Sequence, residues 1–438
     1  MNFPSSRLRL ALALYAALWW LGLPLALAYL RRRARRDADY GAHLAERFGR
    51  HAPFPGAVWV HAVSLGEMRS ATPLVRALLE RGERVVTTHF TPAGRREATR
   101  AFAPEIAAGQ LRAVWVPFEL GFAFRRFFKA FRPKYGLVME IEIWPGMIMA
   151  ARRAGVALFM CNAQYPSKSF ARDTTRTGFR AELMRGFAGA LVKSDLQAER
   201  FARVGVAAIA VTGELRFDQP IPPAQVIAGV AARGWLAPSR PVVTLASVVA
   251  GEDAVYLAAI HASLAAHRAA GLPAPLFVYV PRAPERFDET AQLVAGAGLS
   301  CAARSHLFDA ALAPKGAAPD IDVLLGDSLG EMYFYLAMAD RALVGGGFTP
   351  KGAHNIIEPL ALKKPVIVGP EIWTIEYPAT EAIAAGVVLR VETPGALAAA
   401  LSPGAGFTPA PEMIDAFFAA HAGGVARTLA AIDRFTSR

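Results

Sequence analysis

The feature that most constrains the fold of this chain is a regular alternation of short apolar runs with longer segments of helical period. The first series of runs covers residues 57–62, 84–90, 112–116, 135–140, 156–161 and 189–194. Strands buried in a parallel sheet are continuously apolar, and a helix usually joins each strand to the next. The pattern therefore predicts a doubly wound α/β domain.

A second series of runs predicts a second domain of the same kind. It covers residues 241–247, 275–281, 321–326, 341–347 and 364–369, and the proline-rich stretch 212–223 before it predicts a linker. We place the two domains at 51–220 and 221–438, after an N-terminal segment 1–50. A helix over Glu412–Phe435 is expected to cross back to the first domain. Ligands of such sheets bind beyond the carboxyl ends of the strands, so we expect the site in a cleft between the domains.

The N-terminal segment predicts a membrane anchor. Leu10 to Leu30 is a run of 21 residues without a charge, about 31 Å long as a helix, which matches the hydrocarbon core of a bilayer. Five arginines follow between residues 31 and 36, and only Arg7 and Arg9 precede the run, so residues 31–438 are expected in the cytoplasm. The alternatives are a cleaved signal peptide and a helix lying flat at the surface. A run that is apolar on all faces and followed by arginines favours a spanning helix.

Composition excludes several other classes of protein. The chain has 438 residues, of which 54% are hydrophobic and 19% charged, and this excludes a disordered protein. Its only cysteines, Cys161 and Cys301, exclude a disulfide scaffold. The net charge is +12, and the nine arginines and three acids of residues 1–50 supply half of it. The other basic concentration, at 122–134, is too short for a nucleic-acid partner to be expected.

The segment 122–134 interleaves five phenylalanines with five basic residues. Such a helix can lie on an anionic membrane. It can also cover the core with its phenylalanines and leave its charges in solvent, and this second interpretation is favoured.

Glu67 is the first candidate for acid–base chemistry. It lies in the sequence HAVSLGE (61–67), where a predicted strand ends and a helix begins. A carboxylate in this position can accept a proton from a bound hydroxyl group. The alternative is that Ser64 caps the helix and Glu67 only stabilises its first turn. Spacing alone favours the alternative.

Glu140 and Glu142 follow the apolar run 135–140 and would point to the same side if the strand continued. Desolvated carboxylates need partners, so two acids in this place indicate either a site or a pair held by backbone N–H groups. Their position leaves both interpretations open.

The second half of the chain contains candidate phosphate-binding turns. The sequences GDSLGE (326–331) and GGG (345–347) each follow a predicted strand, and each is expected to open a helix. Backbone N–H groups in such turns suit phosphate. Arg282 can pair with a phosphate or a carboxylate, and Glu358 can bind ribose hydroxyls. The alternatives are turn geometry alone and a solvated arginine. The histidines and cysteines show no metal-binding spacing, so no metal site is predicted.

Taken together, these motifs resemble the bacterial 3-deoxy-D-manno-octulosonic acid (Kdo) transferases of glycosyltransferase family 30. The resemblance covers nearly the whole chain and includes HAVSLGE, MEIEIWP (139–145), NAQYPSKSFAR (162–172), TGELRFD (212–218), VPRAPERF (280–287), GDSLGE and KGAHNIIEP (351–359). It implies a GT-B fold, with two Rossmann-like domains facing a cleft behind one N-terminal transmembrane helix. It also implies transfer of Kdo from CMP-Kdo to a lipid A precursor at the bacterial inner membrane. That transfer inverts the anomeric centre and needs no bound metal or cofactor.

The resemblance implies roles for individual residues. Glu67 matches the general base, and Glu140 matches a residue that stabilises the transition state. Arg216 stands where the family usually has lysine and would offer positive charge to the departing CMP phosphate. The stretches that hold CMP in the second domain match Pro281, Arg282, Leu329, Gly330, Glu331, Asn355, Ile356, Ile357 and Glu358. The first domain would then bind the acceptor.

The sequence departs from the family pattern in three further stretches, one of which is Gly345-Gly346-Gly347, where the family usually has GGS. Gln164 replaces an arginine, and Val248 and Val249 replace polar residues. These departures leave two alternatives: a paralogue that uses another ulosonic acid or another lipid acceptor, and a catalytically silent, membrane-bound nucleotide-binding protein. Retention of both glutamates favours an enzyme, because a silent protein gains nothing from buried acids.

Overall fold

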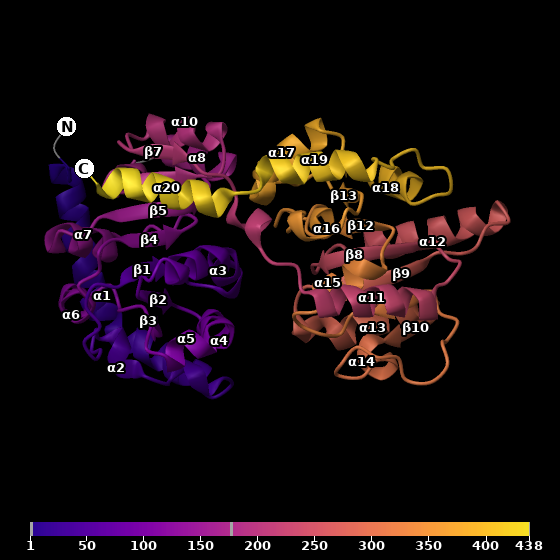
Figure 1. Cartoon of the computed structure of the whole chain (residues 1–438), viewed down its shortest axis with the longest axis horizontal. Coiled ribbons are helices and arrows are strands. Elements are labelled where there is room, and N and C mark those ends of the chain that lie inside the picture. Colours follow the sequence, from indigo (N-terminus) through magenta and orange to yellow (C-terminus); the bar gives the residue numbers. More distant parts are fainter. Residues whose placement is uncertain (1–2, 176–177, 438) are drawn as a thin grey trace. The chain divides into compact units, whose positions relative to one another are not determined.

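The computed structural model describes residues 3–175 and 178–437, and the chain divides into two compact units (Figure 1). Unit 1 comprises residues 1–219 and 422–438, and unit 2 comprises residues 220–421. Each unit is built on a seven-stranded sheet in which all paired strands are parallel. The predicted pair of doubly wound α/β sheets is confirmed.

The sheet of unit 1 has the strand order β3-β2-β1-β4-β5-β6-β7. Its strands are β1 (Val58–His61), β2 (Val85–His89), β3 (Leu111–Trp115), β4 (Gly136–Met139), β5 (Leu158–Ala163), β6 (Gly189–Val192) and β7 (Ile209–Val211). Both faces of β1 are buried, since Trp59 packs into one apolar cluster and Val58 and Val60 pack into the other. The direction of winding reverses between β1 and β4, and ligands of such sheets bind beyond the carboxyl ends at this point.

The helices of unit 1 cover both faces of its sheet. They are α1 (Ser6–Ala34), η1 (Ala38–Tyr40), α2 (Leu44–Arg47), α3 (Leu65–Glu80), α4 (Pro92–Ala101), α5 (Ala103–Ala107), α6 (Gly121–Phe131), α7 (Pro145–Ala154), α8 (Ser167–Thr175), α9 (Phe179–Met184), α10 (Asp195–Arg203), η2 (Leu215–Asp218) and α20 (Gly424–Thr436). By length and composition α1 is a candidate membrane span. In α6, Phe124, Phe127, Phe128 and Phe131 are buried and Arg125, Arg126 and Lys129 are exposed. The core-facing interpretation of 122–134 is therefore correct for these residues.

The sheet of unit 2 has the order β10-β11-β9-β8-β12-β13-β14. Its strands are β8 (Val242–Val248), β9 (Leu276–Pro281), β10 (Cys301–Ala303), β11 (Val323–Leu325), β12 (Arg341–Val344), β13 (Val366–Val368) and β14 (Val388–Arg390). Its helices are α11 (Pro223–Leu236), α12 (Asp253–Ala269), η3 (Pro284–Arg286), α13 (Phe287–Gly296), α14 (Arg304–Leu307), α15 (Met332–Met338), α16 (Ile357–Ala361), η4 (Trp373–Ile375), α17 (Glu376–Ala384), α18 (Pro394–Ala400) and α19 (Pro411–His421). The winding of this sheet reverses between β8 and β12.

Three parts of the predicted organisation differ from the structure. The segment 212–223 is not a linker throughout, because η2 lies within it and buries Leu215 and Phe217 in unit 1. The helix expected over Glu412–Phe435 is two helices, α19 and α20, separated at Gly423, which adopts a φ of +82°. Residues 422–438 belong to unit 1, which confirms the expected return of the chain to the first domain, so the second domain ends before the predicted residue 438.

The last helix, α20, is tied to unit 1 by polar and apolar contacts. Asp218 accepts hydrogen bonds from the backbone N–H groups of Gly423 and Val425, both at 2.6 Å. Leu429 and Ile432 pack into one of the apolar clusters of unit 1. The end of the chain thus completes the core of the unit in which the chain began.

Candidate functional site

Glu67 lies in the first turn of α3, just beyond the carboxyl end of β1. Its Oε2 accepts a hydrogen bond from the backbone N–H of Val63 at 2.6 Å, and its Oε1 accepts one from Ser64 Oγ at 3.2 Å. Ser64 Oγ in turn accepts from the Glu67 N–H at 3.3 Å and caps the helix. This pattern is a variant of the capping box, in which the glutamate accepts from the backbone N–H of Val63, one residue before the N-cap. The structural alternative for Glu67 is therefore present.

The same environment makes the Glu67 carboxyl unusual. The side chain is buried, and this burial, together with the nearby charges of Glu140 and Glu142, raises the pKa of Glu67 to about 8. Two hydrogen bonds to the ionised form oppose the rise without cancelling it. A carboxyl group that titrates near neutral pH is suited to exchange protons with a substrate, so capping and chemistry coexist at this residue.

Glu140 and Glu142 lie beyond β4, next to the end of β1 in the sheet. The strand ends at Met139, and Glu140 has a φ of +56°, so the two glutamates do not continue the alternation of a strand as expected. Glu142 accepts a hydrogen bond from Trp144 Nε1 at 2.6 Å, and burial raises its pKa. The backbone N–H of Glu140 donates to the carbonyl of Cys161 at 2.8 Å.

Arg216, in η2, brings a cation to this group of acids. Its Nη2 lies 3.6 Å from Glu140 Oε1, and its Nε donates to Ser70 Oγ at 2.6 Å. Ser70 belongs to α3, the helix that carries Glu67. The structure therefore brings together the three residues predicted as catalytic, Glu67, Glu140 and Arg216, at the carboxyl ends of the β1 and β4 strands of unit 1.

A buried polar network behind Arg216 was missed by the sequence reasoning. Glu214 Oε2 lies 2.6 Å from Lys193 Nζ, and Glu214 Oε1 accepts from Asn162 Nδ2 at 2.8 Å. Asn162 Oδ1 accepts from the backbone N–H of Leu215 at 3.0 Å. Burial acts to raise the pKa of Glu214, but the charges of Lys193 and Arg216 hold it below its ordinary value. The network fixes the loop that carries Arg216. The only sequence feature that could have predicted this network is the presence of polar residues at the ends of apolar runs.

The predicted CMP-binding residues lie beyond the carboxyl ends of several strands of unit 2. Pro281 ends β9, and Arg282 Nη1 lies 2.8 Å from His354 Nδ1. Leu329, Gly330 and Glu331 lie between β11 and α15, and Arg304 Nη2 lies 2.7 Å from Glu331 Oε1. Asn355 Oδ1 accepts from the Ile357 N–H at 2.9 Å and starts α16, where Ile356 and Ile357 are buried and Glu358 lies in the first turn.

The glycine turn 345–347 differs from its prediction. It does not open a helix directly, because α16 begins only at Ile357. The N–H groups of Gly346 and Phe348 donate to the buried carboxylate of Glu252 at 2.7 and 3.0 Å. A Cβ added at Gly346 would lie 2.2 Å from the carbonyl oxygen of Gly352. Close packing and an internal anion therefore account for this turn, which favours the turn-geometry alternative over a phosphate cradle.

The candidate site has no visible set of metal ligands in the described part of the chain. Within residues 3–175 and 178–437, no three His, Cys, Asp or Glu side chains gather closely enough to hold a metal ion.

Comparison with solved structures supports the class of fold. A glycosyltransferase from Rickettsia africae superposes with a TM-score of 0.56 at 12% sequence identity, over 88% of this chain and 99% of that one. Two doubly wound parallel sheets in one chain, with acidic residues at the switch point of the first, define a two-domain α/β glycosyltransferase fold.

Comparison with known sequences gives the family. Residues 42–219 match the family model described as 3-deoxy-D-manno-octulosonic-acid transferase. A 3-deoxy-D-manno-octulosonic acid transferase of Bordetella pertussis is 43% identical over 422 residues, covering 94% of this chain and 96% of the relative. One from Haemophilus influenzae is 28% identical and covers 81% of each chain. The chain belongs to the 3-deoxy-D-manno-octulosonic acid transferase family.

Proposed function

We propose that this chain transfers Kdo from CMP-Kdo to a lipid A precursor during lipopolysaccharide core assembly, at the cytoplasmic face of a bacterial inner membrane. The observation that carries the proposal is the 43% identity to a Kdo transferase over 94% of the chain. The acids gathered at the switch point of unit 1 supply the chemistry that such a transfer needs.

In the proposed reaction, Glu67 acts as the general base. Its carboxylate takes the proton of an acceptor hydroxyl while that oxygen forms a bond to the anomeric carbon of Kdo, and the bond from that carbon to the CMP phosphate oxygen breaks. Attack from the face opposite CMP inverts the anomeric centre. The raised pKa of Glu67, about 8, makes its carboxylate a stronger base than an exposed glutamate.

Glu140 and Arg216 act on the developing charges in this proposal. The Glu140 carboxylate stabilises positive charge on the sugar ring, and the Arg216 guanidinium offsets negative charge on the departing phosphate. The two groups form an ion pair in the structure, with 3.6 Å between Arg216 Nη2 and Glu140 Oε1. With Arg216 in this role, the proposed transfer requires neither a bound metal ion nor a cofactor.

CMP binding is assigned to unit 2. Arg282 offers positive charge, Glu358 offers a ribose contact, and Pro281, Leu329, Gly330, Glu331, Asn355, Ile356 and Ile357 form the surrounding stretches. The support for this assignment is their common position beyond the carboxyl ends of β9, β11 and β12.

The test is transfer from CMP-Kdo to a lipid A precursor, followed by mass spectrometry of the lipid. Glu67→Gln is expected to lower kcat by roughly 10²–10⁴-fold, the usual contribution of a general base. Glu80→Gln, an exposed acid at the other end of the same helix, is the matched control and should retain activity. Equal turnover by wild type and Glu67→Gln would rule out the base assignment. Transfer from another ulosonic acid donor alone would favour the paralogue.

The departures from the family pattern at Gln164, Val248 and Val249 do not favour a catalytically silent protein. Gln164 is buried and accepts a hydrogen bond from Lys193 at 3.3 Å. Val248 and Val249 are buried next to β9 and Glu252, and their backbone groups accept from Arg282 and donate to Glu252. These three side chains are therefore buried parts of the interior of their units.

A further inference from the structure

The apolar helix α1 is bonded to unit 1 at its first turn and again near its middle. At the N-cap, Ser5 donates its backbone N–H and its Oγ to the two carboxylate oxygens of Glu182, at 2.7 and 2.9 Å. Three turns later, Tyr15 Oη donates to Glu119 Oε2 at 3.2 Å. Glu119 is itself buried and accepts from two backbone N–H groups of α7, so it is part of the folded interior of unit 1.

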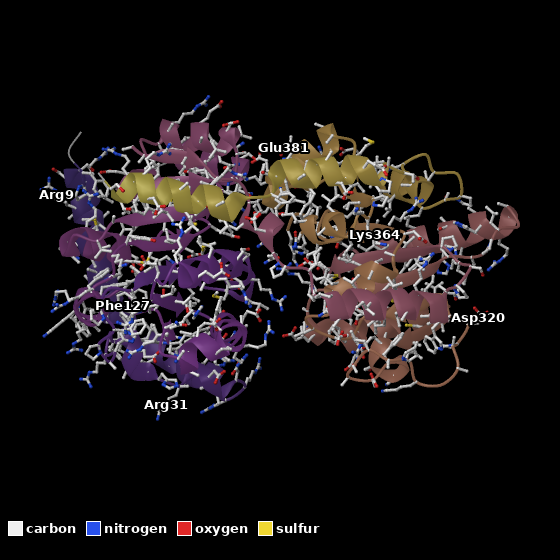
Figure 2. The ribbon with its side chains drawn as sticks, in the orientation of Figure 1. Arg9, Arg31, Phe127, Asp320, Lys364 and Glu381 are labelled. Atoms are coloured by element: carbon white, nitrogen blue, oxygen red, sulfur yellow. The ribbon has the colours of Figure 1, made fainter. Side chains whose placement is uncertain are left out.

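The second half of α1 is held by the same unit. Leu30 is only 6% exposed and packs with Phe118 and Leu120. Just after the helix, Asp37 lies 3.0 Å from Arg96 of α4. Figure 2 shows Arg9 and Arg31, near the two ends of α1, well apart, at the upper left and at the bottom of unit 1.

These contacts cannot coexist with a membrane crossing. A helix that spans the bilayer would separate its first turn from unit 1 by the hydrocarbon core, about 30 Å thick. The bonds from Ser5 to Glu182 and from Tyr15 to Glu119 would then be broken, with polar groups left in lipid. The transmembrane anchor was expected because apolar residues surround the whole helix. One side of that helix, with Trp19, Leu23 and Leu27, packs against unit 1 and is partly covered by it.

The opposite side of α1 is an exposed leucine stripe. It consists of Leu10, Leu14, Leu18, Leu21 and Leu25, which recur every three or four residues and are 59% to 77% exposed. Trp20 is also exposed, and its ring lies 5.6 Å from the ring of Phe122 in α6. An apolar stripe of this size on a soluble surface marks a contact with lipid or protein.

The charges around the leucine stripe favour anionic lipid as its partner. Exposed arginines lie at both ends of α1: Arg7 and Arg9 before the stripe, and Arg31, Arg32, Arg33, Arg35 and Arg36 after it. Arg125, Arg126 and Lys129 are exposed on the adjoining helix α6. Each basic residue near an anionic leaflet contributes about 1 kcal/mol to binding. A second copy of this chain would bring like charges together at both ends of the stripe.

We propose that α1 lies in the plane of the membrane surface, with the leucine stripe among the acyl chains and the flanking arginines at anionic headgroups. The chain is then bound to one leaflet, and both ends of α1 stay on the same side as unit 1. This inference concerns the manner of membrane binding and does not depend on the sugar transferred.

The first test locates the start of α1 in spheroplasts that express the full chain. Ser6→Cys and Ser437→Cys are each made with Cys301→Ser, so that the remaining native thiol is the buried Cys161. Treatment with a membrane-impermeant maleimide should label neither variant until the cells are lysed. Labelling of Ser6→Cys in intact spheroplasts, with Ser437→Cys protected, would show a crossing helix and overturn the proposal.

The second test measures sedimentation of the purified full chain with phosphatidylglycerol-containing vesicles. The double change Leu21→Glu and Leu25→Glu should weaken binding at least about tenfold, because it places two charges in the acyl region. Leu272→Glu, at an exposed leucine of unit 2, is the control and should bind as the wild type does. Unchanged binding by the double variant would refute the leucine stripe as the lipid contact. If the wild-type chain does not bind vesicles but forms dimers, and the double variant is monomeric, the leucine stripe binds a second copy of the chain and the lipid proposal is overturned. Neither test measures sugar transfer, so a negative result in either test can be distinguished from failure of the proposed function.

Discussion

Glu67 in unit 1 and Glu252 in unit 2 occupy comparable places and have different environments. Each follows the first strand of its sheet, each lies where a helix begins, and each accepts a hydrogen bond from a backbone N–H just before it. Glu67 has two hydrogen-bond donors, from Val63 and Ser64. Glu252 has four, from Val249, Gly346, Phe348 and Tyr256, and no exposed surface.

The number of donors separates a reactive carboxyl group from a structural one. The four donors to Glu252 come from the residue that follows β8, from α12, and from the glycine turn with the residue that follows it, so this carboxylate holds three parts of unit 2 together. Glu67 is buried with too few donors to offset its desolvation and the neighbouring acids, which is why its pKa is raised to about 8. Burial alone does not distinguish the two glutamates.

The largest loss of stability is expected for Glu252→Gln. An amide offers one acceptor oxygen in place of two, so at least two buried donors lose their partner, at a cost of about 3–5 kcal/mol in the free energy of unfolding. Urea unfolding of the full chain measures this, with Glu412→Gln, an exposed acid of α19, as control. A Glu252→Gln variant as stable as the control would contradict the structural role.

Glu67→Gln is expected to act in the opposite direction, stabilising the fold at high pH. The folded-state pKa of Glu67 lies above its ordinary value, so the folded state keeps a proton that the unfolded chain releases as pH rises from about 4.5 to about 8. The wild type therefore loses stability through this window, by an amount on the order of 5 kcal/mol, and the glutamine variant does not.

Urea unfolding of wild type and Glu67→Gln between pH 5 and pH 9 separates this effect from other titrations, which both proteins share. The difference between the two should be small at pH 5 and largest above pH 8. A difference that stays constant with pH would mean that the carboxyl group is not destabilised by its site.

The catalytic rate should depend on the same titration of Glu67, but it should rise with pH where the stability falls. If the ionised Glu67 carboxylate is the base, kcat/KM rises about tenfold for each pH unit below the pKa and levels off above about 8. Initial rates of Kdo transfer between pH 6 and pH 9.5 measure this. A wild-type profile that is flat across pH 8, or a residual Glu67→Gln rate with the same inflection, would assign the titration to another group.

The sheets were predictable from the sequence wherever the strands are buried on both faces. The strands that were missed are β7, β10 and β14, each three residues long and each at the edge of its sheet. Apart from Val388, their side chains are not fully buried. At three residues each, Ile209–Val211, Cys301–Ala303 and Val388–Arg390 are also shorter than the apolar runs from which the other strands were predicted. The break at Gly423 was missed for a related reason, since helical periodicity continues on both sides of it.

The acids of the site were predictable because the carboxyl ends of parallel strands meet at one edge of a sheet. The same reasoning could not show which way backbone N–H groups point. It assigned the N–H groups of the 345–347 turn to phosphate, but the N–H groups of Gly346 and Phe348 donate to Glu252. Nor could it pair Lys193 with Glu214, because the two residues come from different connections and meet only in the folded unit.

The smallest expected effect, at Ser64→Ala, tests whether capping and chemistry at Glu67 are coupled. Loss of the N-cap should cost about 1 kcal/mol of stability. Loss of the hydrogen bond from Ser64 Oγ removes one of two donors that favour the ionised carboxylate, so the inflection of the pH–rate profile should move above that of the wild type. Thr393→Ala, which removes the N-cap of α18 in unit 2, is the matched control for the loss of stability and should leave the inflection in place. An equal loss of stability in both variants, with no shift of the inflection in Ser64→Ala, would show that the hydroxyl serves the helix alone.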